Sequence, residues 1–167
     1  MSHDEGNADR VWALMQEIGV AMVVTHNGRG DELRARPMGA RPDAHENAIY
    51  FLTDAAAPKD GEVERNASVC LAFADIKGQR FVSVTGEAAI SNDRAKIKQL
   101  WSAADKAFWR DENDAAIRIL RVVPEDAEYW EGPGATLTAV NMFTAAVTGR
   151  RPNLGDNEKV RLSRAGG

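Results

Sequence analysis

The chain of 167 residues has little of the chemistry on which many enzymes depend, with one cysteine, Cys70, and three histidines, His3, His26 and His45. A single cysteine excludes a disulfide within the chain, and scattered histidines give none of the ligand spacings typical of zinc sites. Cys70 lies in the apolar run VCLAFA, where we expect a buried structural thiol. We therefore expect no metal site.

Long apolar runs and an excess of positive charge are also missing. No run approaches the about 20 residues that a membrane span needs, and the N-terminus MSHDEGNADR is acidic and polar, unlike the apolar core of a signal peptide. The net charge is −4, whereas proteins that bind nucleic acids or anionic membranes carry a basic surface. We expect a cytoplasmic protein with no nucleic-acid or membrane partner.

Familiar catalytic motifs are absent as well. The sequence holds no GxSxG, GxxxxGK[ST], HExxH or GxGxxG pattern. NGRG at 27–30 is a turn signal rather than a phosphate-binding loop. The sequence therefore offers no recognisable pair of a nucleophile and its general base.

Short apolar and alternating segments dominate the rest of the chain and predict mostly β-structure. Turn residues such as the Asn-Gly of the 27–31 turn separate them. Strands are expected at 20–26, 32–40, 48–54, 67–75, 79–91 and 115–132, the last of them broken at Pro124.

Helical spacing of apolar residues marks the remaining segments. Helices are predicted at 7–18, ended by Gly19, at 57–66, and at 92–109, with a cap at Ser91 or Asn92. The segment 41–47 reads as a polar connection, 136–149 as a short strand that passes into a short helix, and the polar tail as extended or mobile.

Six or seven strands joined by short turns do not give the regular strand–helix alternation of a parallel sheet. A small antiparallel barrel with peripheral helices is the natural solution, since closure removes edge strands. We expect a single domain over 1–167, with its core at about 8–149 and a polar tail at 150–167.

Aromatic residues are few, yet four of them are tryptophans. Trp12 and Trp101 fit the apolar stripes of predicted helices and are expected in the core. Trp109 and Trp130 fall near the ends of elements, where a flat ligand or a partner subunit could be met.

Two arginines stand two residues apart in the predicted strand DELRARPMGA, at Arg34 and Arg36. Residues at this spacing share a face, so the guanidinium groups would lie roughly 7 Å apart. At an effective dielectric constant of about 20 they would repel by roughly 2 kcal/mol. Either water solvates them or an anion joins them.

A phosphate-binding site is one way to resolve this repulsion. If the strands at 32–40 and 48–54 are neighbours in a hairpin, Arg36, Thr53 and Lys59 converge, with Lys59 near the start of a helix whose free N–H groups favour an anion. Cations and a hydroxyl group suit a phosphate. The alternative is that these residues are ordinary exposed surface cations.

The order of several segments carries a resemblance. These segments are LRARPMGA, IYFLTDAAAPKDGEVERNASVCLAFAD, FVSVTGEAAISNDRAKIKQLW and RVVPEDAEYWEG. Together they resemble the general stress protein branch of the pyridoxamine 5′-phosphate oxidase-like family, which are flavin-binding split-barrel proteins. The likeness covers about 10–149, and GDNEKVRL in the tail is also typical.

The resemblance implies a mainly β fold, a six-stranded antiparallel split β-barrel, and a homodimer that binds FMN at the subunit interface. It assigns contacts with the flavin or its phosphate to residues in and after the RPM strand. The matching positions are Arg36, Met38, Phe51, Leu52, Thr53 and Lys59, with Arg34 and Trp101 as looser candidates.

Three departures from the family pattern imply weaker flavin binding than in pyridoxamine phosphate oxidases and argue against vitamin B6 oxidation. Pyridoxamine phosphate oxidases usually have Ser-Arg-Lys where this chain has Ala57-Pro58-Lys59, and a glutamine that contacts the flavin where this chain has Phe81. Their C-terminal Arg-x-His signature has no counterpart after Trp130.

Three functions stay open at this stage. The first is an FMN-dependent oxidoreductase, with NAD(P)H as a possible electron donor, in which the cofactor supplies the redox chemistry. The second is a flavin-binding carrier or stress-related protein without catalysis. The third is a split-barrel dimer that has lost its cofactor.

Overall fold

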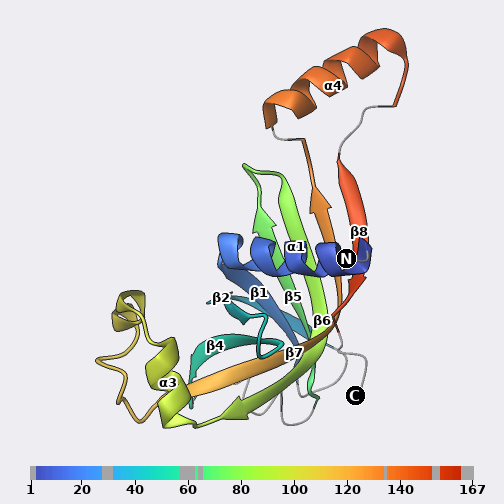
Figure 1. Ribbon diagram of the computed structural model, residues 1–167. Helices are drawn as coiled ribbons and strands as arrows, with labels where there is room; N and C mark the ends of the chain where they lie inside the picture. The colour runs from blue at the N-terminus through green and yellow to red at the C-terminus, as the bar shows by residue number, and fades with distance from the viewer. Residues whose placement is uncertain are drawn as a thin grey trace.

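The computed structural model describes residues 3–27, 32–56, 63, 66–133, 135–151 and 155–162. Within these residues, eight strands form one antiparallel sheet (Figure 1). The strands are β1 (Val20–His26), β2 (Leu33–Gly39), β3 (Arg41–Asp43), β4 (Ala48–Asp54), β5 (Ser68–Asp75), β6 (Arg80–Ser91), β7 (Ile117–Glu131) and β8 (Asp156–Arg161). The helical segments are α1 (His3–Ile18), α3 (Arg94–Leu100), the 3-10 turn η1 (Ala103–Ala107) and α4 (Ala135–Thr148).

The sheet runs in the order β2-β1-β5-β6-β7-β4-β3, and β8 pairs with the second half of β7. It curls until β2 and β4, which lie at and near its two ends, border the same cleft. The six longer strands therefore form an antiparallel split barrel, and the mainly β prediction is confirmed.

Helix α1 fills the concave inner face of the curled sheet (Figure 1). Its residues Val11, Leu14 and Met15 are fully buried and share one core with inner-facing strand residues such as Phe73. The chain then reverses at Gly19, whose φ of +71° is accessible to glycine at low cost. The amphipathic pattern predicted the helix and its C-terminal end correctly, but the helix begins at His3 rather than at residue 7.

A smaller core lies on the opposite, outer face of β4 and β7. Helix α3 covers it with Ile97, and Tyr50 and Leu52 of β4 contribute from the sheet. Six of the seven residues of β4 are buried because the strand is covered on both faces, which explains why its sequence is a continuous apolar run.

The β1–β2 hairpin is confirmed, with His26 opposite Leu33; most of its turn lies outside the described residues. The expected pairing of β2 with β4 is wrong. β2 pairs with β1, while β4 pairs with β3 and β7. The two strands instead approach each other across the split of the barrel.

Two expected elements are divided or extended differently in the structure. The helix expected at 92–109 stops at Leu100, because Trp101 adopts extended backbone angles and a separate turn begins at Ser102. Its N-cap is Asp93, which accepts from the backbone N–H of Lys96. The polar connection at 41–47 contains β3, which pairs with β4.

Further corrections concern the C-terminal half and Cys70. β7 runs without a break through Pro124, which lies opposite Gly86 beside a register shift of the β6–β7 pairing. On its other side, Pro124 falls between the stretches that pair with β4 and β8, so neither of these strands needs its missing N–H. The segment 136–149 is helical throughout. Cys70 is half-buried rather than buried, since it lies on the outer face of β5, where its Sγ is 3.7 Å from Ser83 Oγ.

Other expectations for the chain ends and loops have mixed outcomes. Within the tail, residues 156–161 form β8, which agrees with the extended alternative, and Val160 and Leu162 are buried in the main core. The helix expected at 57–66 falls almost wholly outside the described residues. Trp12 and Trp101 pack against the two cores as predicted.

Candidate functional site

A cleft of about 740 Å³ opens where the two ends of the curled sheet approach each other. This volume lies within the range of about 300–1,000 Å³ typical of small-molecule sites. We call it the β2–β4 cleft. Its walls come from the end of β2, the end of β4 and the segment from α3 to Trp109. It is lined by Gly19, Pro37, Met38, Gly39, Ala40, Arg41, Leu52, Thr53, Asp54, Gln99, Leu100, Ser102, Ala104, Asp105, Phe108 and Trp109.

Thr53 lies at the end of β4, where this wall of the cleft leaves the sheet. Its side chain is 2% exposed, and its Oγ1 is buried with no hydrogen-bond partner among the described residues. Leaving a buried hydroxyl unpaired costs about 1–3 kcal/mol. No hydrogen bond from the described strands offsets this cost.

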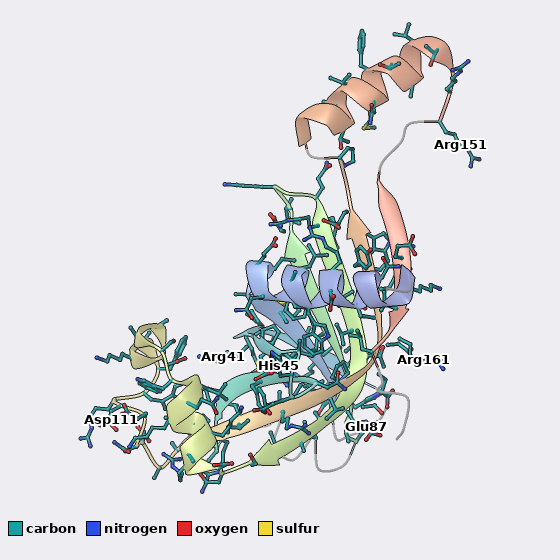
Figure 2. The ribbon with its side chains drawn as sticks, viewed as in Figure 1. Arg41, His45, Glu87, Asp111, Arg151 and Arg161 are labelled. Carbon is teal, nitrogen blue, oxygen red and sulfur yellow. The ribbon has the colours of Figure 1, made fainter. Side chains whose placement is uncertain are left out.

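Arg41 connects the edge of the sheet to the opposite wall (Figure 2). Its Nε donates to the carbonyl of Leu100 at 3.0 Å, its Nη1 to the carbonyl of Gly39 at 3.2 Å and its Nη2 to Asp105 Oδ1 at 2.6 Å. The guanidinium group thus holds the end of α3 and the η1 turn against the sheet.

Asp105 completes this tether from the η1 side. Its Oδ2 accepts both the backbone N–H and the hydroxyl of Ser102, at 2.8 Å each. Burial alone raises the pKa of Asp105, but the hydrogen bonds from Arg41 and Ser102 outweigh burial and hold that pKa below its usual value. Asp105 is therefore an ionised structural anion, not a proton donor at neutral pH.

Two aromatic rings stand at the rim of the cleft beyond η1. Phe108 and Trp109 lie with their ring centroids 5.8 Å apart and their planes tilted by 54°. Trp109 packs against the smaller core, whereas Phe108 is 78% exposed. An exposed phenyl ring beside a cleft is suited to contact a flat ligand or a partner.

Three of the residues predicted for cofactor contact do line the cleft, namely Met38, Leu52 and Thr53. Strand alternation separates Thr53, on the inner face of β4, from Leu52, on its outer face. The structure brings them together with Met38 across the split of the barrel. Trp109, which the sequence suggested for a flat ligand, also lines this cleft.

The other predicted site residues are placed differently. Phe51 is fully buried in the main core, and its side chain is not among those that line the cleft. Trp101 packs against the smaller core. Arg34 is exposed on β2, and Arg36 is half-buried, with Nη1 donating to Thr25 Oγ1 at 3.0 Å. Lys59 lies outside the described residues.

Sequence reasoning missed the tether formed by Arg41 and Asp105. One local signal was available, because Ser102 and Asp105 have the spacing of a helix-capping box, which predicts a new helical turn at Ser102. No local signal links Arg41 to a carboxylate 64 residues away.

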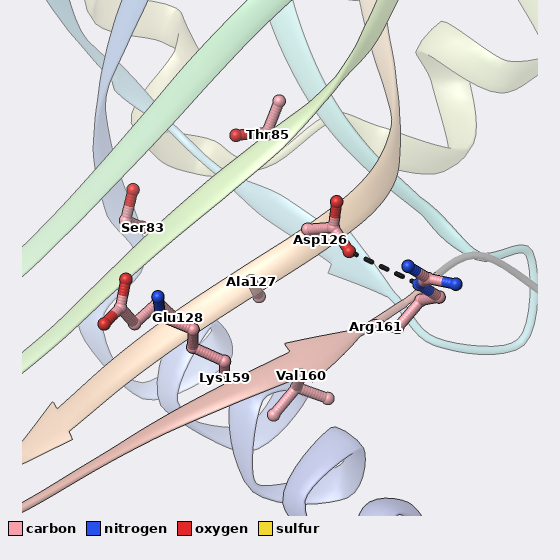
Figure 3. Close-up of a pocket in the computed structure, with 8 residues that line it drawn as sticks. All are labelled: Ser83, Thr85, Asp126, Ala127, Glu128, Lys159, Val160 and Arg161. Atoms are coloured by element: carbon pink, nitrogen blue, oxygen red, sulfur yellow. Dashed lines mark ion pairs between the residues drawn. The ribbon is translucent and has the colours of Figure 1, made fainter.

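A second hollow lies on the outer face of β6, β7 and β8 and has a volume of about 460 Å³ (Figure 3). Its charged groups cancel in sign, with Asp126 and Glu128 opposed by Lys159 and Arg161. The pair of Arg161 Nε and Asp126 Oδ1, 3.7 Å apart, is largely exposed. Such an exposed pair contributes little to the stability of the fold. With no net charge to attract a charged ligand, this hollow is not taken as the functional site.

Two further features of the described residues concern metal ions and membranes. No group of three or more histidine, cysteine, aspartate or glutamate side chains in those ranges is arranged to hold a metal ion. None of the described helices is both long and apolar enough to cross a membrane.

The fold and cleft can be compared with known proteins. The family model described as pyridoxamine 5′-phosphate oxidase like matches residues 6–153, which is most of the chain. The chain belongs to the pyridoxamine 5′-phosphate oxidase-like family. A search of curated proteins found no match.

Solved structures share the fold of this pyridoxamine 5′-phosphate oxidase-like chain at low sequence identity. A proposed general stress protein 26 from Jannaschia sp. CCS1 has a TM-score of 0.73 at 18% identity, covering 94% of this chain and 99% of its own. The general stress FMN/FAD binding protein of Xanthomonas citri has a TM-score of 0.68 at 20% identity, covering 78% and 92%.

A third similar structure is an FMN binding protein from Nostoc punctiforme, described as related to pyridoxamine 5′-phosphate oxidase. It has a TM-score of 0.63 at 12% identity and covers 96% of this chain and 98% of its own. Members of this fold therefore include proteins described as FMN- or FAD-binding.

Proposed function

We propose that this member of the pyridoxamine 5′-phosphate oxidase-like family binds FMN in the β2–β4 cleft. The family, the volume of the cleft and the FMN-binding descriptions of similar structures support the proposal. Arg36 and Lys59 would supply positive charge toward the phosphate, and Met38 and Leu52 would supply apolar contacts.

The single observation that carries the proposal is the buried hydroxyl of Thr53. It borders the cleft and has no protein partner among the described residues. A hydroxyl both donates and accepts hydrogen bonds, so a phosphate or carbonyl oxygen of a ligand would satisfy it. The donor set at this end of the barrel therefore fits a phosphorylated cofactor.

We propose further that the protein is an FMN-dependent oxidoreductase for a small molecule, with NAD(P)H as a candidate electron donor. Bound FMN supplies hydride and electron transfer without a protein nucleophile. The charged side chains that line the cleft are already engaged: Arg41 holds Asp105, and Asp54 accepts the backbone N–H of Ala56 at 2.8 Å. The chain's own contribution is to orient the cofactor and to exclude water.

The same engagement favours a second candidate, a flavin carrier without catalysis. Bleaching of the bound flavin by NADH or NADPH, faster than for free FMN, would support the oxidoreductase. Equal rates would favour the carrier. The homodimer and the cytoplasmic location expected from the sequence remain part of the proposal.

Replacing Thr53 by valine tests the proposal directly. Valine has nearly the shape of threonine but lacks the hydroxyl. We expect Thr53→Val to weaken FMN binding at least about tenfold, because a hydrogen bond to a charged group contributes about 1.5–3 kcal/mol. Without FMN, the variant should be as stable as the original chain or more stable, because a buried unpaired hydroxyl is removed. FMN titration and urea unfolding measure the two effects.

Two controls complete this experiment. Thr53→Ser keeps the hydroxyl and should bind FMN within a few-fold of the original chain. Thr85→Val changes an exposed threonine on the outer face of β6 and should leave FMN affinity unchanged. If Thr53→Val binds FMN as tightly as Thr85→Val, Thr53 does not contact the cofactor and the assignment of the cleft is wrong.

A further inference from the structure

Helix α4 is an apolar helix that the other described residues of its chain leave largely uncovered. Its sequence ATLTAVNMFTAAVT contains no charged residue. Phe143 and Val147 are 73% and 71% exposed, and Val140 and Met142 are each 54% exposed. An uncharged helix with apolar residues around it is normally buried in protein or membrane, and exposed apolar patches of this kind mark interaction surfaces.

The position of α4 explains why the described part of its own chain does not cover it. The helix stands beyond the end of the sheet, on an arm made by the end of β7 and the start of β8 (Figure 1). Near its start, the hydroxyl of Thr138 donates to Gln79 Oε1 at 2.6 Å. At the return into β8, Gly155 has φ of +109°, and a Cβ there would lie 2.0 Å from the carbonyl oxygen of Glu131. The root of the arm is closely packed while the helix is exposed.

A second exposed apolar surface surrounds the mouth of the β2–β4 cleft. Val20 and Met22 of β1 are 52% and 40% exposed, and they lie opposite Gly39 and Pro37, which line the cleft. Phe108 stands at the rim of the same cleft and is 78% exposed. We call Val20, Met22 and Phe108 the rim patch. α4 and the α3–η1 wall lie at opposite ends of the molecule (Figure 1), so α4 does not reach the rim patch of its own chain.

We propose that α4 of one copy packs on the rim patch of a second copy, and that the second copy returns the same contact. This inference rests on the proposed homodimer and names the surfaces that form it. A two-fold axis makes both contacts at once and closes the assembly, so no chain of copies forms. The rim patch is a suitable docking surface for α4 because its three exposed side chains are apolar and α4 itself carries no charged residue.

The area available is enough for a stable dimer. α4 has 14 residues, so it is about 21 Å long and, at a diameter of about 10 Å, offers roughly 300 Å² on half of its surface. Two such contacts, with both partners counted, bury roughly 1,200 Å², which is at the lower end of the range for specific interfaces. The arm would also cover the mouth of the cleft and slow the release of a bound ligand.

Cross-linking between copies tests this arrangement. Chains carrying Phe143→Cys are mixed with chains carrying Phe108→Cys, both also with Cys70→Ala to remove the native thiol, and a short bismaleimide is added. We expect a linked pair of the two variants. As the matched control, Glu87→Cys replaces Phe108→Cys; Glu87 is exposed on β6, far from α4 and the rim (Figure 2), and should give no more linkage than random collision.

A charge on the helix provides the second test, without any cross-linker. Phe143→Glu should raise the dimer dissociation constant at least tenfold, whereas Phe143→Leu should leave it within about twofold of the original value. Because Phe143 is exposed in the single chain, both variants should fold, and circular dichroism checks this. Sedimentation velocity measures the dissociation constants.

The outcomes separate this proposal from the proposed function. A stable dimer that shows no linkage between positions 108 and 143, and that tolerates Phe143→Glu, overturns the arm contact while the dimer and the cofactor stand. A monomeric original chain overturns both the dimer and the arm. Linkage in a chain that binds no FMN supports the arm and refutes only the cofactor.

Discussion

The two arginines of β2 share a face of the strand, but they differ in burial more than their spacing suggested. Arg34 and Arg36 were expected to share one environment, either water or an anion. Instead Arg34 is exposed, while Arg36 is half-buried and donates to Thr25 Oγ1. Arg34 lies near the turn end of the hairpin, opposite Thr25, whereas Arg36 is two residues closer to the part of β2 that lines the cleft, which agrees with its greater burial.

This division makes a prediction with an internal control. Arg36→Ala should weaken FMN binding by about 1.5–3 kcal/mol if the guanidinium group makes a charge-assisted contact, and the sequence predicts the same for Lys59→Ala. Arg34→Ala, on the same strand and in a more exposed position, should have a much smaller effect. Titration of FMN into the three variants measures this. Equal affinity of Arg36→Ala and the original chain would remove Arg36 from the site.

At the scale of elements, periodicity predicted what is local and missed what is tertiary. The apolar face of α1, the strand β1 and the doubly buried β4 are readable because each repeats an apolar pattern over its full length. The break after Leu100 was not readable, since Ile97, Leu100 and Ala104 continue a helical spacing that Trp101 interrupts through its backbone angles. β3 was missed because three residues carry no period.

The candidate site divides in the same way. Met38, Leu52 and Thr53 were predicted because they lie in segments with a family resemblance, and the structure places all three on one cleft. The Arg41–Asp105 tether was not predictable, because it joins two elements whose approach depends on the curl of the whole sheet.

The tether also predicts how the stability of the fold responds to acid. The pKa of Asp105 is lower in the folded protein than its usual value of 3.8, so the unfolded chain binds the proton more readily. The stabilisation from Asp105 is therefore complete above that usual value and is lost as the pH falls through the lower pKa of the folded state.

A comparison with Asp105→Asn isolates this contribution from other carboxylates. At pH 7 the variant should be less stable by about 1–3 kcal/mol, because charge-assisted hydrogen bonds from Arg41 and Ser102 are weakened. The difference between the two proteins should shrink as the pH is lowered from 5 toward 3. Urea unfolding at several pH values measures it, and a difference that stays constant over this range would show that the charge of Asp105 does not hold the η1 turn.

At the scale of the whole molecule, the split of the barrel is what creates the site. β2 and β4 lie at and near opposite ends of the strand order, and neither supplies a hydrogen-bonded neighbour for the other. The gap between them is lined by Met38 on one side and Thr53 on the other. A fully closed barrel would remove this cleft, so the same curl that builds the core leaves room for a ligand.

If the arm of a second copy covers the mouth of this cleft, dimer formation and FMN binding are linked, and each strengthens the other by the same factor. Dilution of the FMN-loaded protein below its dimer dissociation constant should therefore release FMN. FMN should in turn lower that dissociation constant.

Phe143→Glu should release FMN at higher protein concentrations than the original chain, while its monomers should bind FMN no more weakly than the monomers of the original chain. Flavin fluorescence and sedimentation, followed together over a dilution series, measure both sides of this linkage. Monomers that keep their FMN as tightly as dimers would show that the second copy takes no part in holding the cofactor, because linkage requires the two affinities to differ.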